Sequence, residues 1–162
     1  CGFFEARSHL DIARLPEATR ARILPFIVRW ATWRANRFSG DTVMAFYAQV
    51  MAMREATVKA THGFDFVITP TCPIPAFEAE YCCPDNDPER ALEHIAFTVP
   101  YNMSEQPAAS INWSYSTQKR TVGLPIGVQV AGRRFDDLGV LQLSRVIEQI
   151  RPMQRPWPVH IG

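Results

Sequence analysis

The sequence lacks an excess of either charge sign and lacks any long uninterrupted apolar run. Seventeen Lys and Arg residues stand against sixteen Asp and Glu residues, a formal net charge of +1. Proteins that bind duplex nucleic acid normally carry a clear basic excess, so we expect no nucleic-acid partner. No apolar run approaches the roughly 18 residues of a membrane span, and the N-terminus has no signal-peptide pattern. We therefore expect no membrane partner and a cytoplasmic location.

Glycine is scarce and scattered, and metal-ligand spacings are missing. The eight glycines form no cluster, which excludes a P-loop and a dinucleotide-binding loop. No histidine has a second histidine four residues away, and no Cys-x-x-Cys occurs. Cys82, Cys83 and His94 match no recurring zinc module. The sequence therefore predicts no metal and no cofactor.

The four cysteines stand at positions 1, 72, 82 and 83. A domain of this size needs no disulfide, and adjacent Cys82 and Cys83 are poorly placed to bridge each other, so we expect reduced thiols. The chain begins at Cys1 rather than at Met, which favours a processed product, a designed protein or a piece of something longer. An exposed N-terminal Cys can also act as a nucleophile with its own amino group as base. A hydrolase of that kind, using Cys1, stays open as an alternative.

The composition is globular, with 47% apolar and 20% charged residues, and 162 residues suit one region spanning 1–162. Pro16-Glu17 predicts a helix start, and Pro25 predicts a break in the apolar run that follows. Ser39-Gly40-Asp41 predicts the cap of a long helix that His62-Gly63 ends, with Gly63 in the left-handed conformation. The apolar stripe of that helix comprises Val43, Phe46, Tyr47, Val50, Met53, Thr57 and Val58.

Three strands are predicted, at residues 64–69, 107–112 and 124–130. The prolines of 70–75 must take the chain out of the sheet in a rigid loop. Residues 78–93 read as an acidic solvated loop, with a short helix over 88–94. Asp136-Asp137 predicts the cap of a last helix, whose buried face we assign to Leu138, Leu141, Val146, Ile147 and Ile150. Strands alternating with helices indicate an α/β fold class.

Three stretches carry a resemblance to a known family. They are residues 65–75 (DFVITPTCPIP), 97–111 (FTVPYNMSEQPAASI) and 123–137 (GLPIGVQVAGRRFDD). In this order and spacing they resemble the C-terminal part of the amidase signature family, with the resemblance strongest over residues 40–150. It implies part of a mixed β-sheet flanked by helices, within a larger α/β domain that hydrolyses amide bonds.

The catalytic set that the resemblance implies is a nucleophilic Ser, a second Ser and a Lys, with backbone amides holding the oxyanion. In the family these residues lie in a Gly- and Ser-rich stretch of the N-terminal half. This sequence has no Ser-Ser or Gly-Gly pair, and its only lysines are Lys59 and Lys119. We therefore assign no catalytic residue to this chain and expect it to be inactive alone.

The resemblance and the strand-end position of the 70–75 loop indicate a pocket for a small-molecule amide substrate. The candidate pocket residues are Thr71, Cys72, Ile74, Phe97, Thr98 and Asn102. In a competing interpretation, Thr69, Thr71, Asn102 and Gln106 only tie loops together through side-chain hydrogen bonds. Gln129, in an apolar strand, is expected to satisfy a buried backbone group.

Departures from the family pattern leave alternatives open. Many members have Gly where Glu105 stands, so we expect a different local backbone there. Arg133 and Asp136 are expected to form a surface pair. The expected partner is the missing N-terminal half, or a second copy through an exposed sheet face. The alternatives are a non-catalytic binding or assembly module and a fragment like the A subunit of glutamyl-tRNA amidotransferase. A subunit that uses glutamine is expected to carry an acid near residues 95–98. No acid lies within residues 95–98, which weakens the second alternative.

Overall fold

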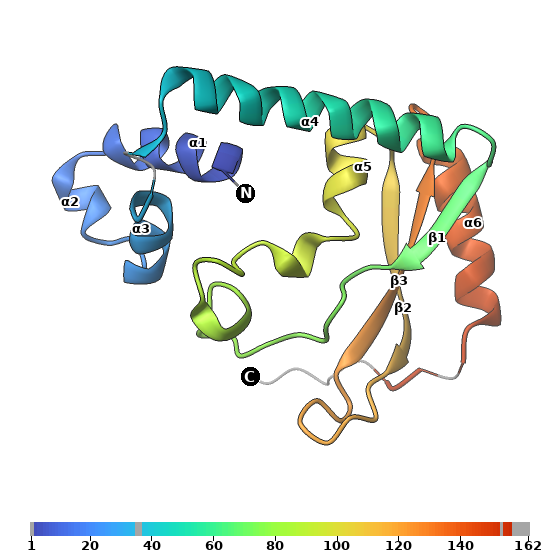
Figure 1. Cartoon of the computed structure of the whole chain (residues 1–162). Coiled ribbons are helices and arrows are strands. Elements are labelled where there is room, and N and C mark those ends of the chain that lie inside the picture. The colour runs from blue at the N-terminus through green and yellow to red at the C-terminus, as the bar shows by residue number, and fades with distance from the viewer. Residues whose placement is uncertain (1, 35–36, 153, 157–162) are drawn as a thin grey trace.

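The computed structural model describes residues 2–34, 37–152 and 154–156, and it divides into a helical group and a sheet joined by one long helix. Figure 1 shows α4 (Gly40–Thr61) running across the top of the molecule, from the small N-terminal helices at one end to the sheet at the other. The N-terminal helices are α1 (Gly2–Ala13), α2 (Glu17–Arg20) and α3 (Pro25–Thr32). Among the residues described, no helix is both long and apolar enough to cross a bilayer.

The sheet consists of β1 (Phe66–Pro70), β2 (Ala108–Tyr115) and β3 (Pro125–Gly132) in the order β1-β3-β2. Both pairings are antiparallel, with Ile68 opposite Val130 and Ile111 opposite Val128. An irregularity between Asn112 and Ser114 shifts the register of β2 near its end. All three predicted strands are present, and the α/β class is confirmed.

Helix α6 (Asp137–Ile150) covers one face of the sheet and makes the main core with it. Val140 and Ile147 pack against Ile111 and Val130, all less than 8% exposed. Asp136 caps the helix as predicted, accepting a hydrogen bond from the Gly139 amide at 3.1 Å.

The predicted buried face of α6 is mostly wrong. Only Ile147 of that set is buried, whereas Leu138, Leu141, Val146 and Ile150 are 50–68% exposed. The helix carries apolar residues on two sides, and periodicity alone does not say which side meets the sheet. Val140, Ser144 and Ile147 make the face that does.

The N-terminal group is held by a buried ion pair. Glu5 on α1 is fully buried and accepts two hydrogen bonds from Arg34, at 2.6 and 2.9 Å. This contact ties α1 to the residues that follow α3. The predicted break is confirmed, because α2 ends at Arg20 and α3 begins at Pro25.

Helix α4 begins as predicted and ends differently. The Ser39 side chain accepts a hydrogen bond from the Thr42 amide at 3.2 Å, which satisfies one of the free donors of the first turn. The predicted left-handed Gly63 is wrong, since only Gly123 among the described glycines has a positive φ. The predicted apolar stripe is half-buried except for Tyr47, which is 45% exposed.

The acidic segment of 78–93 is a loop, as predicted, but the short helix over 88–94 does not form. The segment contains 3-10 turns at Pro84–Asn86 and Glu93–Ile95, with plain turns between them. Arg90 pairs with Asp85 and Glu93, each at 2.8 Å.

The predicted ion pair between Arg133 and Asp136 is wrong. Arg133 pairs with Asp65 at 3.0 Å, because the Asp136 carboxylate caps α6.

Glu105 follows the short helix α5 (Val99–Ser104). We expected the backbone here to differ from the positive-φ turn that a glycine would adopt, and this expectation is wrong. Glu105 adopts the left-handed conformation itself, with φ 60° and ψ 32°. Its carboxylate accepts a hydrogen bond from Arg54 on α4 at 2.6 Å. The ion pair gives α5 a second attachment to α4 and offsets part of the backbone strain.

Candidate functional site

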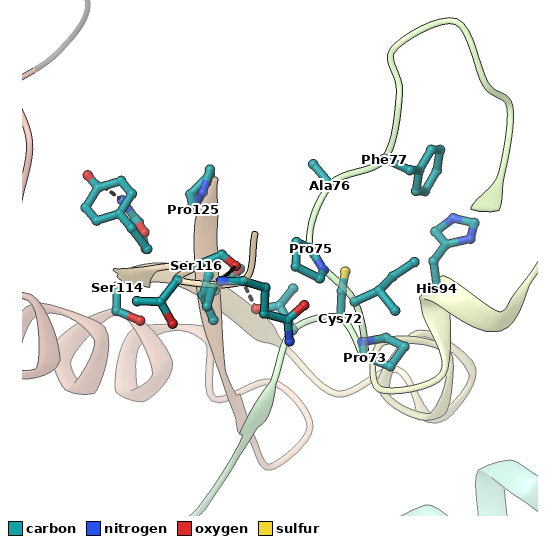
Figure 2. Close-up of a pocket in the computed structure, with 18 residues that line it drawn as sticks. Cys72, Pro73, Pro75, Ala76, Phe77, His94, Ser114, Ser116 and Pro125 are labelled. Carbon is teal, nitrogen blue, oxygen red and sulfur yellow. Dashed lines mark hydrogen bonds between the residues drawn. The ribbon is translucent and has the colours of Figure 1, made fainter. Parts of the chain in front are cut away.

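A cavity of about 750 Å³ opens where the chain leaves β1. Figure 2 shows one side of it formed by Ser114 of β2, Ser116 of the connection that follows, and Pro125 of β3. Phe77 and His94 stand on the other side, with Cys72 and Pro75 between. The cavity therefore lies between the end of the sheet and the 71–77 loop.

The loop is held rigidly at its start. Prolines at 70, 73 and 75 restrict the backbone, and the Thr71 amide still donates to the Gly127 carbonyl at 3.1 Å. The Thr71 hydroxyl also hydrogen-bonds the Ser110 hydroxyl at 2.6 Å. The sheet therefore fixes one end of the loop through both backbone and side chain.

Gly127 leaves room for this hydroxyl pair. A Cβ at position 127 would lie 2.6 Å from Thr71 Oγ1 and 2.8 Å from Ser110 Oγ, closer than real Cβ atoms come. Any larger residue must push the two hydroxyls apart. Gly127 therefore shapes this end of the sheet through the space it leaves.

The lining divides into an apolar part and a polar part, and none of its residues is Asp, Glu, Lys or Arg. The apolar part comprises Pro73, Ile74, Pro75, Ala76, Phe77, Pro125 and Ile126. The polar part includes Thr71, Ser110, Asn112, Ser114, Ser116, Thr117 and Gln118. His94 packs edge-on against Phe77 with ring centroids 5.6 Å apart. Such a lining suits a ligand with an apolar body and hydrogen-bonding groups.

The structure divides the six predicted pocket residues. Thr71, Cys72 and Ile74 line the cavity. Phe97, Thr98 and Asn102 are not among its lining residues. They belong to the segment around α5, which lies beneath α4 in Figure 1.

Two of the second group of three, Phe97 and Thr98, make local hydrogen bonds. The Phe97 carbonyl accepts a hydrogen bond from Gln129 Nε2 at 2.9 Å, and the Thr98 hydroxyl donates to the Ile95 carbonyl at 3.1 Å. Asn102 is exposed on α5. Gln129 is 3% exposed and also donates to Thr69 Oγ1 at 3.0 Å. Its predicted role, satisfying a buried backbone group, is confirmed.

Several lining residues were missed from the sequence, above all Ser110, Asn112 and Ser114. They stand at every second position of β2, and an alternation of polar residues along a strand marks one face of a sheet. That signal was available. His94 and Phe77 carried no comparable signal, because an irregular loop brings them to the cavity.

The described residues assemble no activated nucleophile. No Ser or Thr hydroxyl in residues 2–34, 37–152 and 154–156 hydrogen-bonds to a Lys, a His or a carboxylate. Lys59 lines a separate surface hollow on α4, and Lys119 is exposed between β2 and β3. Cys1, the alternative nucleophile, lies outside the described residues.

No cluster of three or more His, Cys, Asp or Glu side chains suited to a metal ion occurs in the part of the chain that the structure describes. Cys72, Cys82 and Cys83 are free thiols. Burial raises the pKa of the Cys83 thiol above its usual value. An elevated pKa keeps that thiol protonated and unreactive at neutral pH.

Comparison with known proteins gives a consistent family match. The family model described as Amidase matches residues 4–141. Among curated proteins, the glutamyl-tRNA(Gln) amidotransferase A subunit of Thermodesulfovibrio yellowstonii is 36% identical over 101 residues, covering 62% of this chain and 20% of that protein. Its counterpart from Pseudothermotoga lettingae is 38% identical over 89 residues, covering 55% of this chain and 17% of that protein.

Solved structures agree on the fold. A crystal structure of the Thermotoga maritima counterpart matches with a TM-score of 0.58 and 26% identity, covering 94% of this chain and 33% of that one. An amidase crystal structure matches with a TM-score of 0.68 and 19% identity, covering 93% and 36%. A bacterial aryl acylamidase of the amidase signature family gives a TM-score of 0.61 at 19% identity, covering 94% and 34%. The chain thus spans about a fifth of the length of the curated relatives and a third of these structures.

Proposed function

This chain belongs to the amidase family, and on that premise we propose that it forms the C-terminal portion of an amide-hydrolysing enzyme. In this proposal the catalytic Ser–Ser–Lys set lies outside these 162 residues. This chain completes the sheet and supplies part of the wall of the substrate pocket. We further propose a cytoplasmic location, which the three free thiols of the described residues support.

One observation carries the proposal: a ligand-sized cavity is present, but no hydroxyl of its described lining is hydrogen-bonded to a Lys, a His or a carboxylate that could activate it. The cavity holds hydroxyls and an apolar wall at the end of β1. The Ser110 hydroxyl contacts only the Thr71 hydroxyl among the side chains described, and neither can act as a general base. Binding surface without catalytic chemistry is what a non-catalytic portion of such an enzyme would contribute.

The steps of amide hydrolysis assign separate roles to the missing portion and to this chain. A Ser of the missing portion would attack the amide carbonyl carbon, the amine would leave with a proton, and water would then release the acid from the acyl-enzyme. The Ile74 and Phe77 side would hold the apolar part of the substrate, and the Thr71–Ser110 pair would define the depth of the pocket. These contacts position the carbonyl group rather than react with it.

A complementation assay tests the proposal. The aryl acylamidase, with the third that this chain matches deleted, is co-expressed with this chain, and anilide hydrolysis is measured. We expect activity above that of the deleted enzyme alone. A stable, associated pair without restored hydrolysis contradicts the proposal.

Two glycine variants make the assay specific to the cavity. Gly127→Ala places a methyl group against two hydroxyls, so it should lower the restored activity. Gly63→Ala is the matched control, because a Cβ at position 63 meets nothing within 4 Å. Equal activity of the two variants would remove the cavity from the proposed function.

A second candidate function is that of a fragment like the A subunit of glutamyl-tRNA(Gln) amidotransferase. The identities of 36% and 38% to curated proteins of that name favour it. Replacing the matched region of the Thermotoga maritima protein with this chain tests it. Restored glutamine hydrolysis would favour this candidate over a simple amidase, whereas restored hydrolysis of anilides alone would favour the first.

The proposed partner is the missing portion of the enzyme, with self-association as the alternative outcome. Four large apolar side chains on the outer side of α6 support a partner: Leu138, Leu141, Val146 and Ile150 are 50–68% exposed. Sedimentation of the purified chain checks this. Concentration-dependent association is the expected result in the absence of the partner, and a sharp monomer boundary at high concentration contradicts it.

A further inference from the structure

Helix α4 carries more apolar surface than this chain covers. All of its 22 residues are described, and none of them is buried. Met44, Tyr47 and Met51 are 64%, 45% and 36% exposed. In Figure 1, α1, α5 and the sheet lie below α4, and no labelled element lies above it. A helix that is apolar on more than one side normally packs against a neighbour on each, so α4 has room for a second partner.

The exposed side of α4 follows a seven-residue repeat. Its positions alternate in steps of three and four: Asp41, Met44, Ala48, Met51, Glu55, Val58 and His62. Six of the seven are exposed, and Val58 is half-buried. Steps of this kind place residues in one stripe along a helix and are typical of a seam between two helices. At 1.5 Å per residue the stripe is about 32 Å long.

The two halves of this stripe have complementary shapes. The second half carries the surface hollow of about 530 Å³. The residues that line it are Met51, Arg54, Glu55, Val58, Lys59, His62 and Arg134. The first half carries the projecting side chains of Met44 and Tyr47. A two-fold axis near Met51 would make two α4 helices antiparallel and place the projections of each copy over the hollow of the other. Such a contact uses the same surface on both copies, so it closes at two.

Two arginines at the hollow are held in place from α5. Arg54 Nη2 donates to the Glu105 carboxylate, and Arg134 Nε donates to the Ser104 carbonyl, each at 2.6 Å. A guanidinium group has five N–H donors, so both keep donors and a flat face for another contact. In the antiparallel register Tyr47 of the second copy lies across from Arg54. A guanidinium beside a tyrosine ring is a favourable pair.

Charge at the ends of the stripe favours the antiparallel direction. Asp41 lies in the first turn of α4, and Lys59 lies in the last. Among the residues that the structure describes, neither has an ion-pair partner. Antiparallel pairing brings Asp41 of each copy close to Lys59 and His62 of the other, whereas parallel pairing sets like charges together. Glu55 falls opposite the small Ala48, which leaves its carboxylate open to water.

We propose that two copies of this chain pair through antiparallel α4 helices across a two-fold axis at Met51. The proposal goes beyond the proposed function and does not depend on catalysis, since the missing portion of the enzyme is assigned to the outer side of α6. A single pair of helices buries an area at the low end of specific interfaces. We therefore expect a dissociation constant in the micromolar range.

Sedimentation equilibrium of the full chain measures the pairing. Leu138→Lys and Leu141→Lys together form the background, because they remove apolar contacts through α6. The background protein should dimerise, and Met51→Arg should weaken the dimer at least about tenfold by bringing two cations together at the axis. Ala56→Arg is the matched control, since Ala56 is exposed on α4 about 140° around the helix from Met51. A background protein that stays monomeric, or an equal loss with both arginine variants, overturns the proposal.

A charge exchange tests the direction of the helices. Asp41→Lys and Lys59→Asp each set like charges together at both ends of an antiparallel pair, so each alone should weaken the dimer roughly fivefold. An equimolar mixture should dimerise as the background does, and added salt should reduce the difference. A parallel pair predicts no loss in either variant alone, and that result would contradict the proposal. Circular dichroism checks that each variant keeps its helices.

The rival occupant of this surface is the missing portion of the enzyme. Met51→Arg is therefore placed in the pair co-expressed for the complementation assay, and it should change neither the association of the two portions nor the restored hydrolysis. Loss of that association would assign the α4 stripe to the missing portion and overturn the proposal. A dimer of the chain without restored hydrolysis in the unmodified pair would refute the proposed function alone.

Discussion

Breaking the Glu5–Arg34 ion pair should detach the N-terminal helices more than any other single polar change there. Glu5 is fully buried, and its side chain is 1% exposed against 38% for that of Arg34. The hydrogen bond to Glu5 raises the pKa of Arg34, so the guanidinium stays charged. Replacing Arg34 by Met leaves a carboxylate without its cation in a site that water barely reaches.

The expected cost follows from burial. Removing one partner of a fully buried pair costs about 3–5 kcal/mol. The partial exposure of Arg34 lets water solvate the vacated side of Glu5, so we expect about 2–3 kcal/mol for Arg34→Met. With a urea dependence of about 2 kcal/mol per molar, this loss lowers the unfolding midpoint by roughly 1–1.5 M. The double variant Glu5→Gln, Arg34→Met removes the buried charge and should recover part of the loss.

Urea unfolding followed by far-UV circular dichroism measures the midpoint, and hydrogen exchange in α1 localises the effect. Arg90→Ala is the control, since Arg90 also pairs with two carboxylates but does so at the surface. It should leave the midpoint unchanged within error. A midpoint for Arg34→Met as close to wild type as that of Arg90→Ala would refute the reasoning, and so would native protection of α1.

Three further predictions concern single side chains. Glu105→Gly should leave the free energy of unfolding unchanged or raise it by up to about 1 kcal/mol in thermal unfolding, because the strain of the positive φ is relieved while the ion pair with Arg54 is lost. A clear loss of stability would mean that the ion pair outweighs the strain. Gln129→Leu should cost about 1–3 kcal/mol in urea unfolding, since it leaves the buried Phe97 carbonyl without its donor, and a neutral result would contradict the structural role of Gln129. Burial raises the pKa of Cys83, so the folded state retains this proton above about pH 8.5 where the unfolded state loses it, and stability should fall as pH rises beyond that value. Cys83→Ala should show a shallower decline between about pH 8 and 10, and an identical decline would contradict this.

Local signals in the sequence were sufficient where one residue decides the backbone. Pro25 begins α3, and Ser39 and Asp136 cap α4 and α6. Each effect arises within a few residues of its cause: a missing amide donor or a side-chain acceptor beside free amides. Such effects do not depend on the rest of the chain. Pro70, predicted to lie outside the sheet, is instead the last residue of β1, which is an edge strand and tolerates a missing amide donor.

Decisions that depend on distant contacts were not available from the sequence. The two apolar sides of α6 are equivalent until the sheet selects one of them. Arg133 has Asp136 near it in the sequence and Asp65 near it in space. The Asp136 carboxylate caps α6, and Arg133 pairs with Asp65. Glu105 tolerates a positive φ with a cation supplied from α4, 51 residues away in the chain.

The candidate site shows the same division. Thr71, Cys72 and Ile74, predicted from a strand end followed by prolines, line the cavity, and their contact with substrate stays a prediction. Phe97, Thr98 and Asn102 were chosen by resemblance and lie outside the lining of this cavity, which includes Ser110, Asn112 and His94. Which loop reaches a strand end is a question of tertiary packing, and spacing along the chain does not answer it.

The most direct test of the central claim is turnover by the purified chain itself. The chain is assayed against a panel of simple amides, with and without a serine-reactive fluorophosphonate, and the Cys1→Ala variant is run in parallel. The account predicts no hydrolysis above background and no labelled serine, since the described residues contain no activated hydroxyl. Clear turnover that the fluorophosphonate or Cys1→Ala abolishes would contradict it, because a nucleophile would then reside within this chain.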